Sequence, residues 1–245
     1  MNVIKIMGGL GNQLCQYATG KHLEQYDSIA FDISYYDEDI NKNGSVPHRD
    51  FLLPKLVDNL TYATQEDRER VNQWEYKLGT VYKNKYFWGD WQKASFFKDA
   101  DLKINLTEDI MDEAAADILE HIRDDNSVAI HIRRTDYIGL GWALDVAYYE
   151  KAMAEILKTN KNAVFYIFSD DLSWSEENLY GDVFVKFDTL TDLYLMSECK
   201  HNIIANSTYS FWAAYLNKHQ DKKVIYPKDW ICTSNPVDCL PWIGI

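Results

Sequence analysis

The chain has 245 residues, of which 47% are hydrophobic and 26% charged, an ordinary composition for a globular protein. Its formal net charge of −13 excludes a broad basic face for nucleic acid or an anionic membrane, but leaves room for a local phosphate pocket. The start, MNVIKIMGGLGNQ, is unlike a signal peptide, and no apolar run approaches the ~20 residues of a membrane span. We therefore expect a cytoplasmic protein that visits the inner membrane only through a partner or a lipid-linked substrate.

The first third of the chain predicts a strand–turn–helix–strand unit. Apolar residues over 3–7 predict a short buried strand, and the run GGLGN (8–12) predicts a tight turn. Helical spacing then continues to about Tyr26, and a second strand is expected over 28–33. Such a unit is typical of the start of a parallel α/β sheet.

The middle of the chain is less regular. Helices are expected around 64–78 and over 107–123, with the aromatic strand or loop YFWGDWQ (86–92) between them. Trp88 and Trp91 belong either to the core or to a platform for a sugar ring, and burial is the more frequent fate of such large aromatic side chains.

From residue 127 strands and helices alternate regularly. Strands are expected over 127–133, 163–168, 183–187, 202–205 and 223–226, with helices at about 147–158, 174–179, 192–199 and up to Leu216. The strand at 223–226 is expected to close the series. This alternation predicts a doubly wound sheet, which binds ligands outside the carboxyl ends of its strands. Three polar loops follow such ends: RRTD (133–136), SDD (169–171) and NSTYS (206–210).

Arg133 and Arg134 follow a buried strand that also carries His131. Because neighbouring strand residues point to opposite faces, one guanidinium can enter a ligand site while the other braces the loop. The planar fork of arginine fits a phosphate with two hydrogen bonds. An ion pair with Asp136 at the surface is the alternative, and His131 is as readily a core histidine as a ligand contact.

Other candidates also have two readings. Ser207 or Thr208 caps the following helix or exposes its backbone N–H groups to a phosphate, and the two roles are compatible. Asp170 and Asp171 are a candidate pair for Mg²⁺ or Mn²⁺, although no other carboxylate cluster supports a metal. The glycine run and Asp32 resemble the motif that binds NAD, but the third glycine of that motif is missing.

Four runs together resemble the motif set of the bacterial alpha-1,2-fucosyltransferases in order and spacing, and GDWQ (89–92) resembles a further block. The resemblance covers the whole chain, with Cys15 in place of the usual phenylalanine and Thr135 in place of the usual glycine. It implies an α/β, GT-B-like fold of two Rossmann-like domains facing across a cleft, with 1–125 on the acceptor side and 126–245 binding GDP-fucose. The four runs are GGLGNQLCQYA (8–18), HIRRTDY (131–137), SDDLSWSEENL (169–179) and IIANSTYSFWAAYLN (203–217).

The resemblance implies an inverting hexosyltransferase, an alpha-1,2-fucosyltransferase of O-antigen or oligosaccharide biosynthesis. It would move fucose from GDP-fucose to a hydroxyl, O2 of a terminal galactose, on an oligosaccharide or lipid-linked glycan, without a metal or other cofactor. Two alternatives stay open. One is an NAD-linked oxidoreductase, and the other is a non-catalytic glycan-binding protein on a transferase-like fold.

The resemblance also implies roles for individual residues. HIRR is similar to the donor motif of alpha-1,6- and protein O-fucosyltransferases, in which the first arginine contacts the diphosphate, so that role falls to Arg133. Asp136 is the second catalytic candidate, as a general base with Asp145 as its rival. Donor-binding candidates are Gly11, Asn12, His131, Arg133, Arg134, Ser169, Asp170, Asp192, Asn206, Ser207 and Thr208. Acceptor-binding candidates are Asp32, Trp88, Trp91 and Gln92, and no metal ligand is expected.

Overall fold

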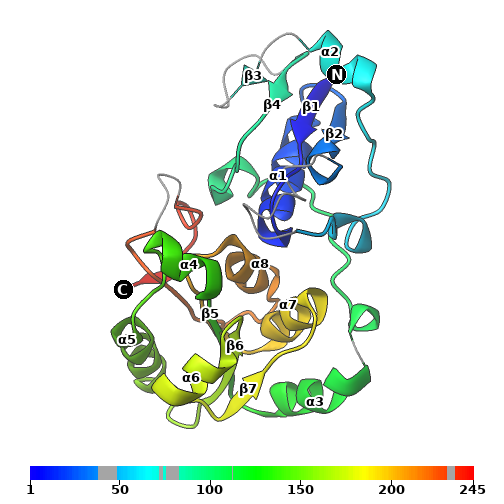
Figure 1. The fold of residues 1–245 in the computed structure, drawn as a ribbon. Helices are drawn as coiled ribbons and strands as arrows, with labels where there is room; N and C mark the ends of the chain where they lie inside the picture. The colour runs from blue at the N-terminus through cyan, green and yellow to red at the C-terminus, as the bar shows by residue number, and fades with distance from the viewer. Residues whose placement is uncertain (38–48, 72–73, 76–82, 112, 231–234) are drawn as a thin grey trace. The chain divides into compact units, whose positions relative to one another are not determined.

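The chain forms two compact units, each built on its own parallel sheet (Figure 1). The computed structural model describes residues 1–37, 49–71, 74–75, 83–111, 113–230 and 235–245. Unit 1 comprises Met1–Asn105 and Ser234–Leu240, and unit 2 comprises Leu106–Thr233 and Pro241–Ile245. This division lies ahead of the boundary expected at 125, because helix α3 (Ala116–Asp124) packs against β5 and α7 of unit 2.

Unit 1 has a four-stranded sheet in the order β2-β1-β4-β3, with every pair parallel. The strand–turn–helix–strand prediction is confirmed, since α1 (Leu10–Leu23) joins β1 (Asn2–Lys5) to β2 (Ile29–Asp32). Gly20 of α1 permits this close packing, because a Cβ there would lie 2.8 Å from the ring of Phe31. Short 3-10 turns lie at Ser34–Tyr36, Leu53–Lys55 and Ala94–Phe96.

The helix expected around 64–78 is only partly present. Helix α2 (Gln65–Arg70) ends where Val71 takes up extended backbone, and β3 (Trp74–Glu75) then pairs with β4 (Tyr86–Phe87). Pairing with a distant strand therefore overrides the local helical pattern. The remainder of that prediction, 72–73 and 76–78, lies outside the described residues.

Unit 2 has a six-stranded parallel sheet in the order β10-β9-β8-β5-β6-β7. The predicted strands are confirmed, but β9 does not close the series, because β10 pairs beside it at the sheet edge. The region 107–123 also begins with two 3-10 turns, Glu108–Ile110 and Glu113–Ala115, before α3. The strands are β5 (Ser127–Ile132), β6 (Val164–Ser169), β7 (Val183–Val185), β8 (His201–Ile203), β9 (Val224–Tyr226) and β10 (Ile243–Gly244).

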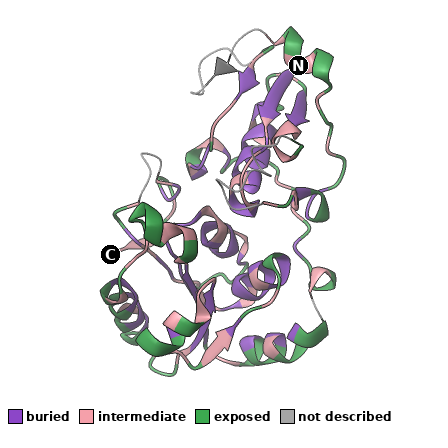
Figure 2. Ribbon diagram, viewed as in Figure 1, coloured by how far each residue is buried: buried purple, intermediate pink, exposed green. Residues whose placement is uncertain are grey.

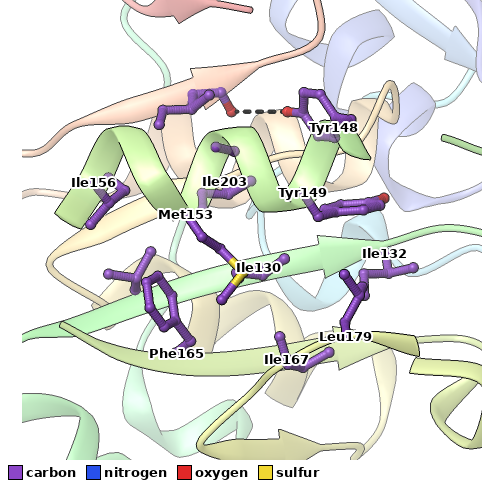
Figure 3. Packing of buried hydrophobic residues seen from close by; sticks show 13 residues of the cluster. Ile130, Ile132, Tyr148, Tyr149, Met153, Ile156, Phe165, Ile167, Leu179 and Ile203 are labelled. Atoms are coloured by element: carbon purple, nitrogen blue, oxygen red, sulfur yellow. Dashed lines mark hydrogen bonds between the residues drawn. The ribbon is translucent and has the colours of Figure 1, made fainter. Parts of the chain in front are cut away.

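Helices cover both faces of this sheet, as a doubly wound layout requires. Alternate residues of β5 face α5, and Figure 3 shows Met153 of α5 pointing toward Ile130. Helices α3, α7 and α8 pack together on the other side (Figure 1). Figure 2 shows the consequence, a buried β5 and β6 beneath helices with exposed outer sides. The remaining helices of unit 2 are α4 (Thr135–Leu140), α5 (Val146–Leu157), α6 (Leu172–Asn178), α7 (Thr189–Glu198) and α8 (Thr208–Leu216).

Helix α4 begins at Thr135, within the RRTD run that was expected to be a loop. It is a single short element of 6 residues, and it ends at Gly141, whose φ of +70° is the left-handed conformation that glycine adopts readily. Among the described residues, no helix is long and apolar enough to cross a membrane.

Candidate functional site

The strand order of unit 2 places its polar loops at a topological switch point. The chain runs from β5 to β6 and β7 on one side, then returns to β8 and β9 on the other. Doubly wound sheets bind ligands where the strand order reverses, at the carboxyl ends of the strands. RRTD follows β5, NSTYS follows β8 and SDD follows β6, so the three loops meet at this edge.

Arg133 is held between two carboxylates. Its Nη2 lies 2.8 Å from Asp136, and its Nη1 lies 3.0 Å from Asp170. Burial alone would lower the pKa of Arg133, but the two carboxylates outweigh it and raise that pKa. The guanidinium is therefore charged and fixed in orientation, while 21% of its side chain stays exposed to a ligand.

Arg134 has different side-chain partners from Arg133, as alternation along a strand predicts for neighbouring residues. Its guanidinium carbon stacks 3.5 Å from the centre of the Trp174 ring, and its Nε lies 3.4 Å from Asp171. Both partners belong to the start of α6, where Asp171 accepts a hydrogen bond from the Trp174 backbone N–H. Arg134 therefore braces the loop against α6. Sequence reasoning missed Trp174, although it lies three residues after the helix-capping aspartate.

His131 lies beneath this loop as a neutral side chain. Burial, followed by the nearby Arg133, lowers the pKa of His131 to about 3. Its ring packs 5.4 Å from that of Tyr209 in α8, and within the described residues its Nδ1 has no hydrogen-bond partner. Ser169 is also buried and accepts a hydrogen bond of 3.0 Å from the Asp171 backbone N–H. A neutral histidine adds no positive charge beside Arg133.

The start of α8 has no side-chain cap. Ser207 stands at the N-cap position without a capping hydrogen bond, which contradicts the capping reading for this residue. Asn206 donates to the Trp142 carbonyl at 3.0 Å, and its buried Oδ1 has no hydrogen-bond partner among the described residues. Thr208 is the first residue of the helix. Helix starts of this kind bind anions through their backbone N–H groups.

Asp192 lies in the first turn of α7. One of its oxygens accepts a 3.0 Å hydrogen bond from the Phe187 backbone N–H. Burial raises the pKa of Asp192 to about 7, and the nearby Asp188 acts in the same direction. A partly buried carboxyl with so strongly raised a pKa at a ligand-binding edge is a candidate functional group.

We expect Asp192→Asn to melt at a higher temperature than the wild type at pH 8, with the difference shrinking toward pH 4. A raised folded-state pKa makes the carboxyl stabilising at low pH, and this contribution is lost as the pH rises through about 7. Thermal melts across this range are the measurement.

Asp188→Asn is the control, and its change in melting temperature should have the opposite sign. Burial would raise the Asp188 pKa, but hydrogen bonds from Thr191 and Leu190 lower it, so this variant should melt lower than the wild type at pH 8. An Asp192→Asn variant that melts lower at pH 8 would contradict the assignment.

The glycine turn of unit 1 also lies at a topological switch point. It follows β1, next to β4, and residues 89–92 follow β4. Gly8 has a φ of +79°, and its carbonyl accepts a 3.0 Å hydrogen bond from the Tyr36 hydroxyl. Asn12 accepts from Gln92 at 3.3 Å and donates to Asp90 at 3.5 Å, while Gly11 is buried in α1. The structure therefore joins the predicted turn to the GDWQ block.

Two buried glutamines, missed by sequence reasoning, hold this turn in place. The Gln13 amide donates to the carbonyls of Gly8 (3.1 Å) and Asp50 (2.8 Å). Its oxygen accepts from the backbone N–H groups of Leu52 (3.0 Å) and Leu53 (3.1 Å). Gln16 accepts from Met7 at 2.9 Å and donates to Gly89 at 3.1 Å. Two glutamines three residues apart, directly after the glycine run, were the signal in the sequence.

The acceptor-binding candidates lie at different depths in unit 1. Asp32 is 1% exposed, with its carboxylate bonded to Arg68 at 3.0 Å, to the Ser34 backbone N–H at 3.0 Å and to the Tyr86 hydroxyl. Burial would raise the pKa of Asp32, but these partners lower it. Its carboxylate is thus satisfied internally, which disfavours the ribose contact that a dinucleotide site needs.

The remaining acceptor-binding candidates, Trp88, Trp91 and Gln92, differ in how far they are buried. Trp91 is 5% exposed and packs against Phe87 and Phe96, which is the core alternative. Gln92 is buried and bonded to Asn12, whereas Trp88 is only partly buried.

In unit 2, Asp145 caps α5 by accepting from the Tyr148 backbone N–H at 2.9 Å. Across the described residues, no group of three or more histidine, cysteine or acidic side chains is placed to hold a metal ion.

Comparisons of the whole chain with known proteins agree on one family of glycosyltransferases. The profile described as Glycosyl transferase family 11 matches residues 1–232. The O-antigen biosynthesis glycosyltransferase WbnK of Escherichia coli is 31% identical, over 94% of this chain and 95% of its own length. An alpha-1,2-colitosyltransferase of Escherichia coli is 29% identical, over 93% and 91%. The galactoside alpha-(1,2)-fucosyltransferase 2 of Mus musculus is 26% identical, over 87% and 67%.

Solved structures share the fold. The fucosyltransferase NodZ from Bradyrhizobium superposes with a TM-score of 0.51 at 15% identity, covering 88% of this chain and 93% of its own. A NodZ alpha-1,6-fucosyltransferase structure soaked with GDP-fucose gives 0.50 at 16% identity, covering 88% and 92%. At these identities the likeness concerns the fold alone. It confirms the predicted GT-B-like class, with two Rossmann-like α/β units.

Proposed function

Because the chain belongs to glycosyl transferase family 11, we propose that it is an inverting alpha-1,2-fucosyltransferase. The donor is GDP-fucose, and the acceptor is a hydroxyl of a glycan, O2 of a terminal galactose. The observation that carries the proposal is the charged, fixed Arg133 at the switch point of unit 2, beside the uncapped start of α8. A relative named as a galactoside alpha-(1,2)-fucosyltransferase supports the choice of fucose as the transferred sugar.

Unit 2 supplies the donor-binding groups in this proposal. Arg133 contacts the diphosphate, and the backbone N–H groups at Ser207 and Thr208 add hydrogen bonds to it. As the sugar–oxygen bond breaks, negative charge grows on the leaving GDP. A guanidinium that is already oriented stabilises this charge without reorganising, which is the largest single contribution in many enzymes.

The acceptor hydroxyl attacks the face of the fucose opposite to the leaving GDP. Its oxygen bonds to the anomeric carbon as the bond to the diphosphate breaks, its proton passes to solvent, and the anomeric centre inverts. Two candidate bases have structural roles that compete with proton transfer. Asp136 is paired with Arg133 at 2.8 Å, so its carboxylate already serves an ion pair. Asp145 caps α5. We therefore assign Asp136 to support of Arg133. In this proposal the enzyme works in the cytoplasm, on a free oligosaccharide or a lipid-linked glycan at the inner membrane.

The experiment that tests the proposal is a screen of galactose-terminated acceptors with GDP-fucose, with the product linkage read by NMR. GDP-colitose is the second donor to test, because one relative is named as a colitosyltransferase. Titration with GDP and with NAD accompanies the screen. Binding of NAD but not GDP would favour an oxidoreductase. Binding of GDP without transfer to any acceptor would favour a glycan-binding protein.

We expect fucosyl transfer to continue in excess EDTA. The positive charge beside the diphosphate comes from Arg133 in this proposal, so a divalent cation is not needed to stabilise the leaving group. Initial rates before and after chelation are the measurement. Loss of activity that Mn²⁺ or Mg²⁺ restores would show that Asp170 and Asp171 serve a metal instead.

A further inference from the structure

The Asp170 carboxylate connects three successive residues of the RRTD loop. It accepts hydrogen bonds from the Arg134 backbone N–H at 2.8 Å and from the Thr135 hydroxyl at 2.6 Å. It also forms an ion pair with Nη1 of Arg133 at 3.0 Å. One side chain thus fixes the backbone of the loop and the direction of its first guanidinium.

The elements that carry the two carboxylates around Arg133 differ in how firmly they are anchored. Asp136 lies in the first turn of the short α4, three residues after Arg133 in the same segment of chain. Asp170 directly follows β6, a strand of 6 residues, five of them buried, that pairs with β5 on one side and β7 on the other. The anchor that the sheet itself provides for Arg133 is therefore Asp170.

We propose that Asp170 is a positioning residue that acts on sugar transfer through Arg133, without contacting the donor. This inference rests on the proposed function. A carboxylate in direct contact with a diphosphate would repel it, whereas a carboxylate on the far side of a guanidinium favours the charged form and its orientation. An arginine side chain loses much rotamer freedom when it is fixed, and Asp170 fixes it before the donor arrives.

The test is a double-mutant cycle with Asp170→Asn in the wild-type and Arg133→Lys backgrounds. If Asp170 acts through Arg133, Asp170→Asn should lower kcat by about tenfold or more in the wild type, but by less than about threefold in the Arg133→Lys background. Equal factors in both backgrounds would overturn the proposal. Thermal melts confirm folding of each variant. Should Asp170→Asn fail to fold, Asp170→Glu, which keeps the charge but displaces it, is compared in the same two backgrounds.

Asp182→Asn is the matched control. Asp182 likewise accepts one hydrogen bond from a backbone N–H, that of Phe165 at 2.8 Å, and one from a hydroxyl, that of Tyr180 at 2.7 Å. It directly precedes β7, at the amino end of the strand, and neither of these bonds involves an arginine. Its substitution should change kcat by less than about twofold in both backgrounds.

GDP titration provides a second readout that needs no turnover. Loss of a positioning carboxylate should weaken GDP binding, whereas loss of a carboxylate facing the phosphates should strengthen it by removing repulsion. Tighter GDP binding by Asp170→Asn would therefore overturn the proposal while leaving the proposed function intact. A wild-type protein that neither binds GDP nor transfers fucose would instead overturn the proposed function, and this inference with it.

Discussion

Arg133→Lys is expected to lower kcat for fucosyl transfer by about 10²–10³, or ~3–4 kcal/mol of transition-state stabilisation. Lysine keeps the charge but lacks the planar fork, so it cannot hold two diphosphate oxygens at once. The charge on the leaving GDP is larger in the transition state than in the ground state, so kcat should fall more than the affinity for GDP-fucose. Steady-state kinetics at saturating acceptor separate the two effects.

The geometry of Arg133 strengthens this expectation. Its two terminal nitrogens each face a different carboxylate, at 2.8 Å and 3.0 Å. A lysine ammonium is a single point charge on a flexible stem, so the orientation that the two carboxylates impose on the fork is also lost.

Arg134→Lys is the matched control for this prediction. Arg134 stacks on Trp174 and pairs with Asp171, so its side chain supports the loop from the α6 side. Its substitution should therefore cost less in kcat than that of Arg133 and more in melting temperature. A folded Arg133→Lys enzyme with near wild-type kcat, or a larger kcat loss in Arg134→Lys, would show that the leaving-group contact was assigned to the wrong arginine.

The second large effect is expected at Gln13 in unit 1. Gln13→Leu keeps the approximate size of the side chain but removes four hydrogen bonds to backbone groups around the glycine turn. At about 1 kcal/mol for each bond, the loss should be ~3–4 kcal/mol in the free energy of unfolding of unit 1. Hydrogen exchange followed by mass spectrometry measures this loss, because it reports the stability of separate segments.

Gln16→Leu is the control for Gln13. Gln16 is equally buried in the same helix but makes two such bonds, so it should destabilise unit 1 by about half as much. Peptides from unit 2 should exchange at wild-type rates in both variants. Equal losses for the two glutamines would mean that burial of the amide, rather than its bonding to the turn, sets the cost.

Patterns within the sequence predicted most strands of unit 2 and the sheet edge that carries the site. The regular alternation of strands and helices from residue 127 predicted the parallel sheet of unit 2. The alternation of side chains along a strand predicted that Arg133 and Arg134 diverge, and they contact different partners, Asp136 for Arg133 and Trp174 for Arg134. These features depend on near neighbours in the chain, so they are readable from the order of residues.

Other features depend on partners that are distant in sequence. The loop at 133–135 meets Asp170, which is 36 residues from Arg134, and Gln13 meets Leu53, 40 residues away. The helix expected through 74–75 failed for this reason, because β3 pairs with the later strand β4. The strand at 223–226 forms as expected but is not the last of the sheet, because β10 pairs beside it.

The sequence by itself thus determined the α/β class, the polar loops at the strand ends and the two arginines of this protein. Only the tertiary structure decided the strand order that puts the ends of β8 and β6 on either side of β5. It also decided which carboxylate anchors Arg133. The physical reason is that strand order follows from hydrogen bonds and side-chain packing between remote segments, and the hydrophobic period of a strand carries no information about which strand will lie beside it.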